Sequence, residues 1–353
     1  MAFPGIERLD PTRFDNPAIL KRLASASRSL AELKGVAVSI PNQAVLINSL
    51  GLQEAKDSSA IENIVTTHDE LFQNSLFPDV AANVAAKEVQ RYRQALNVGF
   101  TALMQDRLLT NNHIQAIQRA LEQNDAGFRK VPGTVLKDSA GNTVYTPPDP
   151  TEVSSLMDNL QRFINDDALF AADPLIKMAL MHHRFETIHP FYDGNGRTGR
   201  IINVLYLVQH GLLDTPILYM SRHIVRTKNE YYRLLQDVRE RDAWEEWVLY
   251  MLEAVDRTAR DGLATVVAIR EALRDYKQRI RTQFKFYSQD LINNIFMHPY
   301  TKIAFVEADL NVSRLTATKY LNALTDAGFL RKARAGRANY YVNTALVDII
   351  QRA

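Results

Sequence analysis

The chain of 353 residues contains no cysteine. This absence excludes disulfides, thiolate metal sites and cysteine nucleophiles together, and it agrees with a reducing compartment. No run approaches the ~18 uninterrupted apolar residues of a membrane span. The N-terminus has no basic segment followed by an apolar run, so it does not resemble a signal peptide. We therefore expect a cytoplasmic protein with no membrane segment.

Charge of one sign is also scarce. The formal net charge is +2, which by itself points to no nucleic-acid partner. Hydrophobic residues make up 46% and charged residues of both signs 23%, a composition typical of a globular protein rather than a disordered one. The length predicts two or three domains.

Most of the chain has apolar residues at helical spacing, so the expected fold class is mainly α. Helices are expected at residues 16–31, 40–52, 57–64, 80–100, 111–121, 153–165, 174–187, 199–210, 228–239 and 244–281. The segment 199–210 is apolar on most faces, which predicts a buried central helix. Prolines and glycines interrupt the pattern at 128–150, where β-prone pieces at 134–136 and 143–146 predict a hairpin.

Residues 284–353 have the pattern of a separate small module that resembles a winged helix. Helices are expected at 290–296, 302–308 and 313–327, followed by strands at 329–333 and 339–342. Ser313 is the expected N-cap of the third helix and Gly328 its end, with Leu315 packing inward. The module carries six basic residues on this helix and hairpin: Arg314, Lys319, Arg331, Lys332, Arg334 and Arg337. They leave open DNA binding, protein docking or dimerisation.

The densest group of chemistry-bearing residues is the segment His189–Arg200, directly before the apolar helix. Gly194 and Gly196 permit positive φ angles and a close backbone approach. Backbone N–H groups at such a helix start form an anion site that the helix dipole strengthens. Arg197 and Arg200 are three residues apart, so they share a helix face beside that site and can clamp phosphate oxygens.

The same segment supplies the other groups that phosphate chemistry needs. Asp193 offers an oxygen ligand for Mg²⁺, which bridges phosphates, and Asn195 offers a neutral donor. His189 at the mouth is the natural general base, and a buried Phe191 would anchor the loop. A single Gly-x-Gly turn or histidine is more often structural, but these functions fall together within twelve residues. The concentration favours a catalytic site.

This segment is similar to the Fic-family motif, His-x-Phe-x-(Asp/Glu)-Gly-Asn-Gly-Arg-x-x-Arg, at every defined position. The resemblance implies a Fic-fold helical bundle that transfers AMP from ATP to a Tyr, Thr or Ser hydroxyl of a target protein. It implies that His189 deprotonates that hydroxyl and that Asp193 holds Mg²⁺. It also implies that the loop from Gly194 to Arg200, including Thr198 and Gly199, cradles the phosphates.

Other regions extend the resemblance to roughly residues 50–255. The hairpin at 128–148 is similar to the Fic flap, whose exposed edge could pair with an extended target segment. Asn229 and Tyr232, beside Tyr231, resemble the stretch that contacts adenosine. The expected organisation is an N-terminal helical region (1–105), a Fic catalytic domain (106–255), a linking helix (256–283) and the winged-helix module (284–353).

The segment Ser58–Asn63 resembles the family's inhibitory pattern, (Ser/Thr)-x-x-x-Glu-(Gly/Asn), on the helix expected at about 57–64. Ser58 and Glu62 are four residues apart, hence on one helix face. The resemblance implies that Glu62 pairs with Arg200 and keeps it from the γ-phosphate, so that basal activity is low. In some relatives the same glutamate supports removal of AMP, and the sequence leaves both roles open.

A metal site is the alternative interpretation of His183, Glu186 and His189, which are spaced three apart. The pattern is not His-Glu-x-x-His, and metal ligation conflicts with a base role for His189. We therefore expect His182 and His183 to be structural.

Three functions remain open on the sequence. The first is an autoinhibited adenylyltransferase using ATP and Mg²⁺. The second is an enzyme that transfers another nucleotide or removes AMP. The third is a DNA-binding regulator whose Fic part senses nucleotide. A homodimer is also left open.

Overall fold

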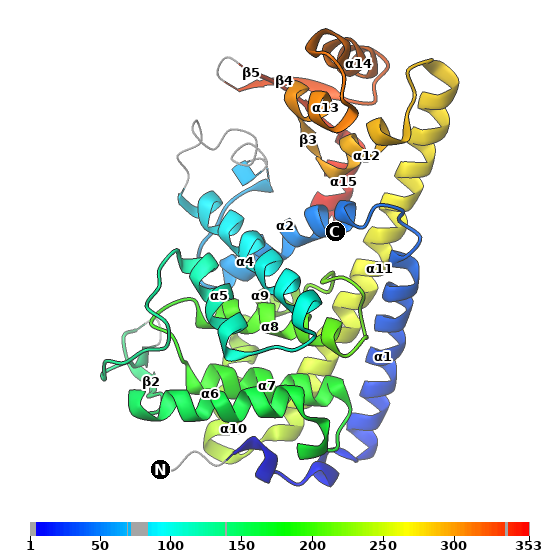
Figure 1. Ribbon diagram of the computed structural model, residues 1–353. Coiled ribbons are helices and arrows are strands. Elements are labelled where there is room, and N and C mark those ends of the chain that lie inside the picture. The colour runs from blue at the N-terminus through cyan, green and yellow to red at the C-terminus, as the bar shows by residue number, and fades with distance from the viewer. Residues whose placement is uncertain (1–4, 69, 72–83, 138–139, 336–337, 353) are drawn as a thin grey trace. The chain divides into compact units, whose positions relative to one another are not determined.

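The computed structural model describes residues 5–68, 70–71, 84–137, 140–335 and 338–352 (Figure 1). The chain forms two compact units, Met1–Ala31 with Arg91–Thr258 and Glu32–Gln90 with Ala259–Ala353. The boundaries between the units fall within the long helices α1 (Pro17–Ala37), α4 (Val84–Asp106) and α11 (Trp244–Gln283). Within the described residues, no helix combines the length and apolarity needed to cross a bilayer.

The first unit is mainly helical. Its remaining elements are η1 (Ile6–Arg8), η2 (Pro11–Phe14), α5 (Asn111–Glu122), β1 (Leu136–Lys137), β2 (Thr143–Tyr145), α6 (Pro150–Asn165), η3 (Asp167–Leu169), α7 (Pro174–Ile188), α8 (Asn195–Gln209), α9 (Ser221–Arg226) and α10 (Lys228–Arg241). Asp149 and Asp173 cap α6 and α7, and in each helix proline occupies the first turn. Helix α7 packs against both α6 and α8 (Figure 1).

The buried central helix expected at 199–210 is confirmed, although α8 begins earlier, at Asn195. Its close packing on α7 depends on Gly199. A side chain there would place its Cβ 3.0 Å from Phe185 and 3.1 Å from the carboxylate of Glu186. The helix that follows the motif is therefore held firmly by the core of the unit.

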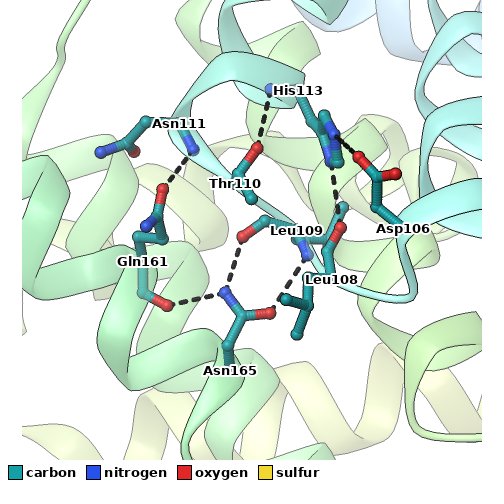
Figure 2. Close-up of polar contacts among 8 residues, drawn as sticks. All are labelled: Asp106, Leu108, Leu109, Thr110, Asn111, His113, Gln161 and Asn165. Atoms are coloured by element: carbon teal, nitrogen blue, oxygen red, sulfur yellow. Dashed lines mark hydrogen bonds and ion pairs between the residues drawn. The ribbon is translucent and has the colours of Figure 1, made fainter.

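The turn between α4 and α5 is fastened to α6 by amide side chains, as Figure 2 shows. Asn165 donates to the carbonyl of Leu109 (2.7 Å) and accepts from its N–H (3.1 Å). The side-chain oxygen of Gln161 accepts the N–H of Asn111 at 2.6 Å. These bonds fix the start of α5, whose other end reaches the motif loop.

Helix α2 (Ala44–Ile61) of the second unit differs from the two helices that the sequence predicts in its place. Helices were expected at 40–52 and 57–64, but α2 is a single helix. The segment between them, 53–56, holds no glycine or proline and continues the helix. Glu62 is the C-cap residue beyond the last turn, and Asn63 has a left-handed φ of 64°.

The expected winged-helix pattern is confirmed and extended in the second unit. Its elements are α12 (Gln289–Met297), β3 (Tyr300–Thr301), α13 (Ile303–Leu310), α14 (Arg314–Asp326), β4 (Arg331–Ala335), β5 (Ala338–Val342) and α15 (Thr344–Arg352). The sheet order is β3-β5-β4, antiparallel throughout. Strand β3 and helix α15 were not anticipated.

The predicted ends of α14 are confirmed, but the predicted burial of one of its residues is not. Ser313 accepts the N–H of Thr316 as the expected N-cap, and Gly328 follows the C-cap Ala327 with φ of 80°. The expected inward packing of Leu315 is wrong: its side chain is 84% exposed, because it lies in the first turn, on the outer face. Arg337 lies outside the described residues.

The hairpin expected at 128–148 is confirmed, with shorter strands. β1 and β2 pair antiparallel, with Leu136 opposite Tyr145 and Lys137 opposite Thr143. The first strand begins two residues later than expected, after Gly133, whose φ of 100° suits a turn. Residues 138–139 of the expected turn lie outside the described residues.

Candidate active site

The loop between α7 and α8 begins and ends in left-handed backbone. His189 follows the last turn of α7 with φ of 49°, and its N–H donates to the carbonyl of Phe185 at 3.0 Å. Gly194, the N-cap of α8, has φ of 76°. The first backbone N–H groups of α8 therefore open toward this loop, which is the arrangement that binds anions.

The interior of the loop is held by an aromatic anchor and an amide. Phe191 is fully buried, with ring centroids 5.4 Å from Phe128 and 6.4 Å from Phe185, so its expected anchoring role is confirmed. The side chain of Asn195 accepts the N–H of Phe191 (2.8 Å) and donates to its carbonyl (2.9 Å). Asn195 therefore stabilises the loop, and its NH₂ group, the donor expected at the phosphates, bonds to Phe191 in this structure.

The two motif arginines lie on α8 and are almost completely buried, at 4% and 3% exposure for Arg197 and Arg200. Arg197 donates to the carboxylate of Glu122, at the end of α5, at 2.8 Å. The same carboxylate oxygen would lie 2.4 Å from a Cβ at Gly194. The φ angle of 76° favours glycine at 194, and a side chain there would also displace the carboxylate of Glu122.

The other motif positions differ in what they can offer a ligand. Thr198 is fully buried and Gly199 faces α7, so they shape the helix start rather than present side chains to a phosphate. Gly196 is half-buried, with its backbone at the first turn. Tyr192 is 49% exposed, and its hydroxyl accepts the N–H groups of Lys130 (2.8 Å) and Val131 (3.2 Å).

Arg129, at the base of the hairpin, ties the hairpin to the loop. Its Nε donates to the carbonyl of His189 (2.9 Å), and its Nη2 donates to those of Pro148 (2.5 Å) and Ile188 (3.3 Å). Its own N–H donates to the carbonyl of Pro190 at 2.8 Å. Burial lowers the pKa of Arg129, an effect that the charge of Asp149 opposes. The bonds join both hairpin ends to the residue expected to be the base.

The second hairpin strand is fastened to α7 and α10. The hydroxyl of Tyr145 donates to the carbonyl of Thr187 (2.9 Å), and the Arg239 guanidinium lies 3.9 Å from the Tyr145 ring centroid. Gln236 donates to the carbonyl of Val144 at 3.3 Å. The outer edge of β2 is therefore occupied, which leaves the edge of β1 for another strand.

Asp193 fits the metal ligand that the motif implies. Its carboxylate is exposed at the loop, and Oδ1 accepts the N–H of Gly194 at 2.7 Å. One carboxylate together with substrate phosphates is a common way for proteins to hold Mg²⁺.

Comparison with known protein families supports the resemblance of this loop to the Fic motif. Three protein-family profiles match: "Fic/DOC family N-terminal" over residues 20–101, "Fic/DOC family" over residues 108–207 and "Protein adenylyltransferase SoFic-like, C-terminal domain" over residues 273–346. Together they cover more than half of the chain. The chain belongs to the Fic family. The match begins earlier than the resemblance in the sequence indicated, and it includes the winged-helix module.

Relatives and solved structures agree with the Fic assignment. The chain is 31% identical over 114 residues to "Protein adenylyltransferase Fic" of Aedes aegypti, covering 32% of this chain and 21% of that protein. It therefore spans about a fifth of the length of this curated relative. A Fic family protein from Desulfovibrio desulfuricans matches with a TM-score of 0.60 and 21% identity, covering 93% of this chain and 96% of that one. Fic-1 from C. elegans has a TM-score of 0.56 and 19% identity, over 72% and 74% of the two chains. These likenesses show the Fic fold.

The Fic residues expected near adenosine lie on α10. Asn229 is exposed and Tyr232 is 45% exposed, so both can meet a ligand. Tyr231 is 1% exposed and shares a 2.8 Å hydrogen bond with Nε2 of His182. Tyr232 therefore lies at the surface, whereas Tyr231 belongs to the core.

The inhibitory residues of the Fic sequence lie in the second unit. Ser58 is fully buried in the last turn of α2, whereas Glu62 is exposed beyond it. Because Arg200 belongs to the first unit, the Glu62–Arg200 pair stays a prediction.

His182 and His183 are structural, as expected. His182 stacks on Trp247 with centroids 6.0 Å apart, and Nε2 of His183 donates to the carbonyl of Leu235 at 3.1 Å. Burial, together with the charge of Arg200, lowers the pKa of His182 to about 3. Burial also lowers the pKa of His183 well below its usual value, with a smaller contribution from Arg239.

These two histidines predict a loss of stability in mild acid. Above about pH 6.5, the unfolded pKa of histidine, both side chains are neutral in the folded and in the unfolded chain. Below that pH they bind protons in the unfolded chain but stay neutral in the folded chain. Each buried histidine should lower the free energy of unfolding by about 1.4 kcal/mol per pH unit below 6.5. Urea unfolding between pH 7.5 and 5 should give a shallower dependence for His182→Gln than for wild type. Equal dependences would contradict burial as the cause.

Proposed function

We propose that this protein transfers AMP from ATP to a hydroxyl group of a target protein. The complete Fic loop, with His189 before α8 and Arg197 and Arg200 within it, is the observation that supports this. His189 takes the proton of the target hydroxyl, whose oxygen forms a bond to the α-phosphorus. The bond from that phosphorus to the bridging oxygen breaks, and pyrophosphate leaves.

Other residues of the loop and two residues of α10 position the nucleotide. The N–H groups from Gly194 to Arg200 and the Arg200 guanidinium hold phosphate oxygens, and Asn229 and Tyr232 hold the adenosine. Asp193 holds Mg²⁺, which supplies positive charge to the phosphates when bound. Such fixed charges act where negative charge develops, so much of the rate enhancement comes from positioning and electrostatics.

The flap offers a place for the target chain. Because Gln236 occupies the carbonyl of Val144, an extended target segment would pair along β1, in the manner of strand addition. Exposed apolar side chains at Val131 and Val135 precede that strand and would contact the target.

Glu62 restrains this activity in our proposal, by pairing with Arg200. We expect Glu62→Gly to gain an added AMP after incubation with ATP and Mg²⁺, read by intact mass or by labelled ATP in a cell lysate. Wild type should gain much less. If a folded Glu62→Gly protein adds AMP neither to itself nor to any protein in the lysate, the transferase function is contradicted.

Two related reactions share this site. Removal of AMP would use the same loop with water as the attacking group, and a different nucleotide would use the same phosphate cradle. Competition among ATP, GTP, CTP and UTP in the Glu62→Gly protein distinguishes donors, and release of AMP from a modified target identifies the reverse direction.

DNA binding by the winged-helix module is a second candidate, favoured by the outer face of α14. Arg314, Leu315 and Lys319 are all exposed there, and the exposed cations of β4 follow them. Helices of this kind read the major groove with such a face. A homodimer and a cytoplasmic location remain predictions from the sequence.

If DNA is a ligand, affinity measured by fluorescence anisotropy should fall steeply from 50 to 200 mM salt. Each lost phosphate contact should reduce the log–log slope by about 0.9. Arg314→Ala with Lys319→Ala should flatten the slope, whereas Arg352→Ala in α15 should not. Unchanged anisotropy of duplex DNA at low salt would remove this candidate.

A further inference from the structure

A cavity of about 180 Å³ lies within the second unit, apart from the Fic loop. The connection from α1 to α2, the first turn of α2, and helices α11 and α12 form its walls. Its lining is largely apolar, with Ile40, Val45, Leu273 and Ile292. Three of these four residues are 1% exposed, so the apolar wall is part of the packed core of the unit.

Positive charge borders this cavity. Arg270, Arg274 and Lys277 occupy positions i, i+4 and i+7 of α11, and therefore lie along one helix face. All three are exposed, and none forms an ion pair with any residue that the structure describes. No acidic side chain is among the described residues that line the cavity.

Two other arginines of α11 are neutralised. Arg257 pairs with Glu253 at 2.6 Å and Arg279 pairs with Asp275 at 2.9 Å, both one turn away on the same helix. The helix thus provides carboxylate partners for these two arginines and none for the three cations at the cavity. Such unbalanced charge beside an apolar wall is suited to an anionic ligand with an apolar body.

Amide side chains complete the lining. Asn42 uses its oxygen to accept the N–H of Ala44 (3.0 Å), and Asn293 uses its oxygen to accept from Gln289 (3.1 Å). Among the described contacts, the NH₂ groups of Asn42 and Asn293 have no acceptor. They are donors available to the polar edge of a ring.

We propose that this cavity binds a nucleoside phosphate. A cavity of about 150 Å³ accommodates a benzene ring, so this one accommodates a nucleobase. The base contacts Leu273 and Pro41, the apolar residues of the lining that remain partly exposed. The amides contact the edge of the base, and Arg270, Arg274 and Lys277 hold the phosphates on the exposed side. The site is separate from the Fic loop and does not require the proposed transfer activity.

Photo-crosslinking of the full chain with 8-azido-ATP tests this site directly, because peptide mapping reports where the nucleotide lies. We expect label on the 39–45 segment or on α12, in addition to any label near Tyr232. The double variant Arg270→Ala, Arg274→Ala should reduce the label on the 39–45 segment and on α12 at least about tenfold, since each charge-assisted contact contributes strongly to binding. Arg281→Ala, an exposed cation of the same helix outside the lining, should leave it unchanged.

Two results would overturn the proposal. One is the absence of label on both segments at saturating nucleotide. The other is equal protection of these segments by tripolyphosphate and by ATP, because a site that reads only phosphate has no nucleobase pocket. Stronger protection by ATP supports the nucleoside assignment.

Discussion

Replacement of His189 by asparagine in the Glu62→Gly protein is expected to lower AMP transfer by about 10²–10⁴-fold. Asparagine is preferred to alanine because His189 has a φ of 49°, a left-handed conformation that asparagine tolerates well. The variant therefore removes the imidazole while preserving the turn that opens toward α8. Initial rates with labelled ATP measure the loss.

The loss should be in the chemical step rather than in nucleotide binding. We expect His189→Asn to bind ATP within about threefold of its parent, because in the proposed mechanism backbone N–H groups and Arg200 hold the phosphates. His113→Asn is a matched control, since His113 contacts Asp106 in the α4–α5 turn and takes no part in the loop. Near-parental transfer by His189→Asn would exclude histidine as the base.

Arg129→Met is expected to lower the free energy of unfolding by about 3 kcal/mol and to impair transfer at least tenfold. The substitution removes three side-chain hydrogen bonds and leaves the buried carbonyls of Ile188 and Pro148 and the partly buried carbonyl of His189 without this donor. Methionine fills much of the volume, so the effect reports the bonds rather than a cavity. Urea unfolding and initial rates measure the two effects.

Lys130→Met is the matched control for this prediction. The Lys130 side chain is exposed, and the bond from its backbone N–H to Tyr192 survives the substitution. We expect its stability to stay within about 0.5 kcal/mol of wild type, as for most surface changes. Equal stability of Arg129→Met and wild type would show that the hairpin and the loop are held by other contacts.

The motif loop could be predicted from sequence because its residues are contiguous and its chemistry is local. Arg129 and Glu122 could not, since they meet the loop across 60 and 75 positions of the chain. The importance of these two residues for the site comes from tertiary contacts, and an isolated arginine or glutamate in the sequence does not indicate such a contact. Asn195 is a different case: the sequence predicts a donor that faces phosphate, but in the structure the bonds of its amide run to the backbone of Phe191.

The start of α7 at Pro174 was predicted correctly, whereas α6 begins at Pro150, three residues before its expected start, because proline suits the first turn of a helix. The expected division into helices at 40–52 and 57–64 was wrong, because no helix-breaking residue lies between them and α2 continues through the segment. Leu315 shows the opposite limitation. Its spacing matches the buried face of α14, yet a first-turn residue can face outward while the rest of the stripe is covered.

The continuity of α2 has a mechanical consequence. Its 18 residues form a rod about 27 Å long. Val45, in the first turn, lines the cavity, and Ile61, in the last, directly precedes Glu62. Two short helices with a flexible joint would absorb a displacement between them. A single rod behaves as a lever, so a tilt of about 5° at the cavity end carries the far end through about 2 Å.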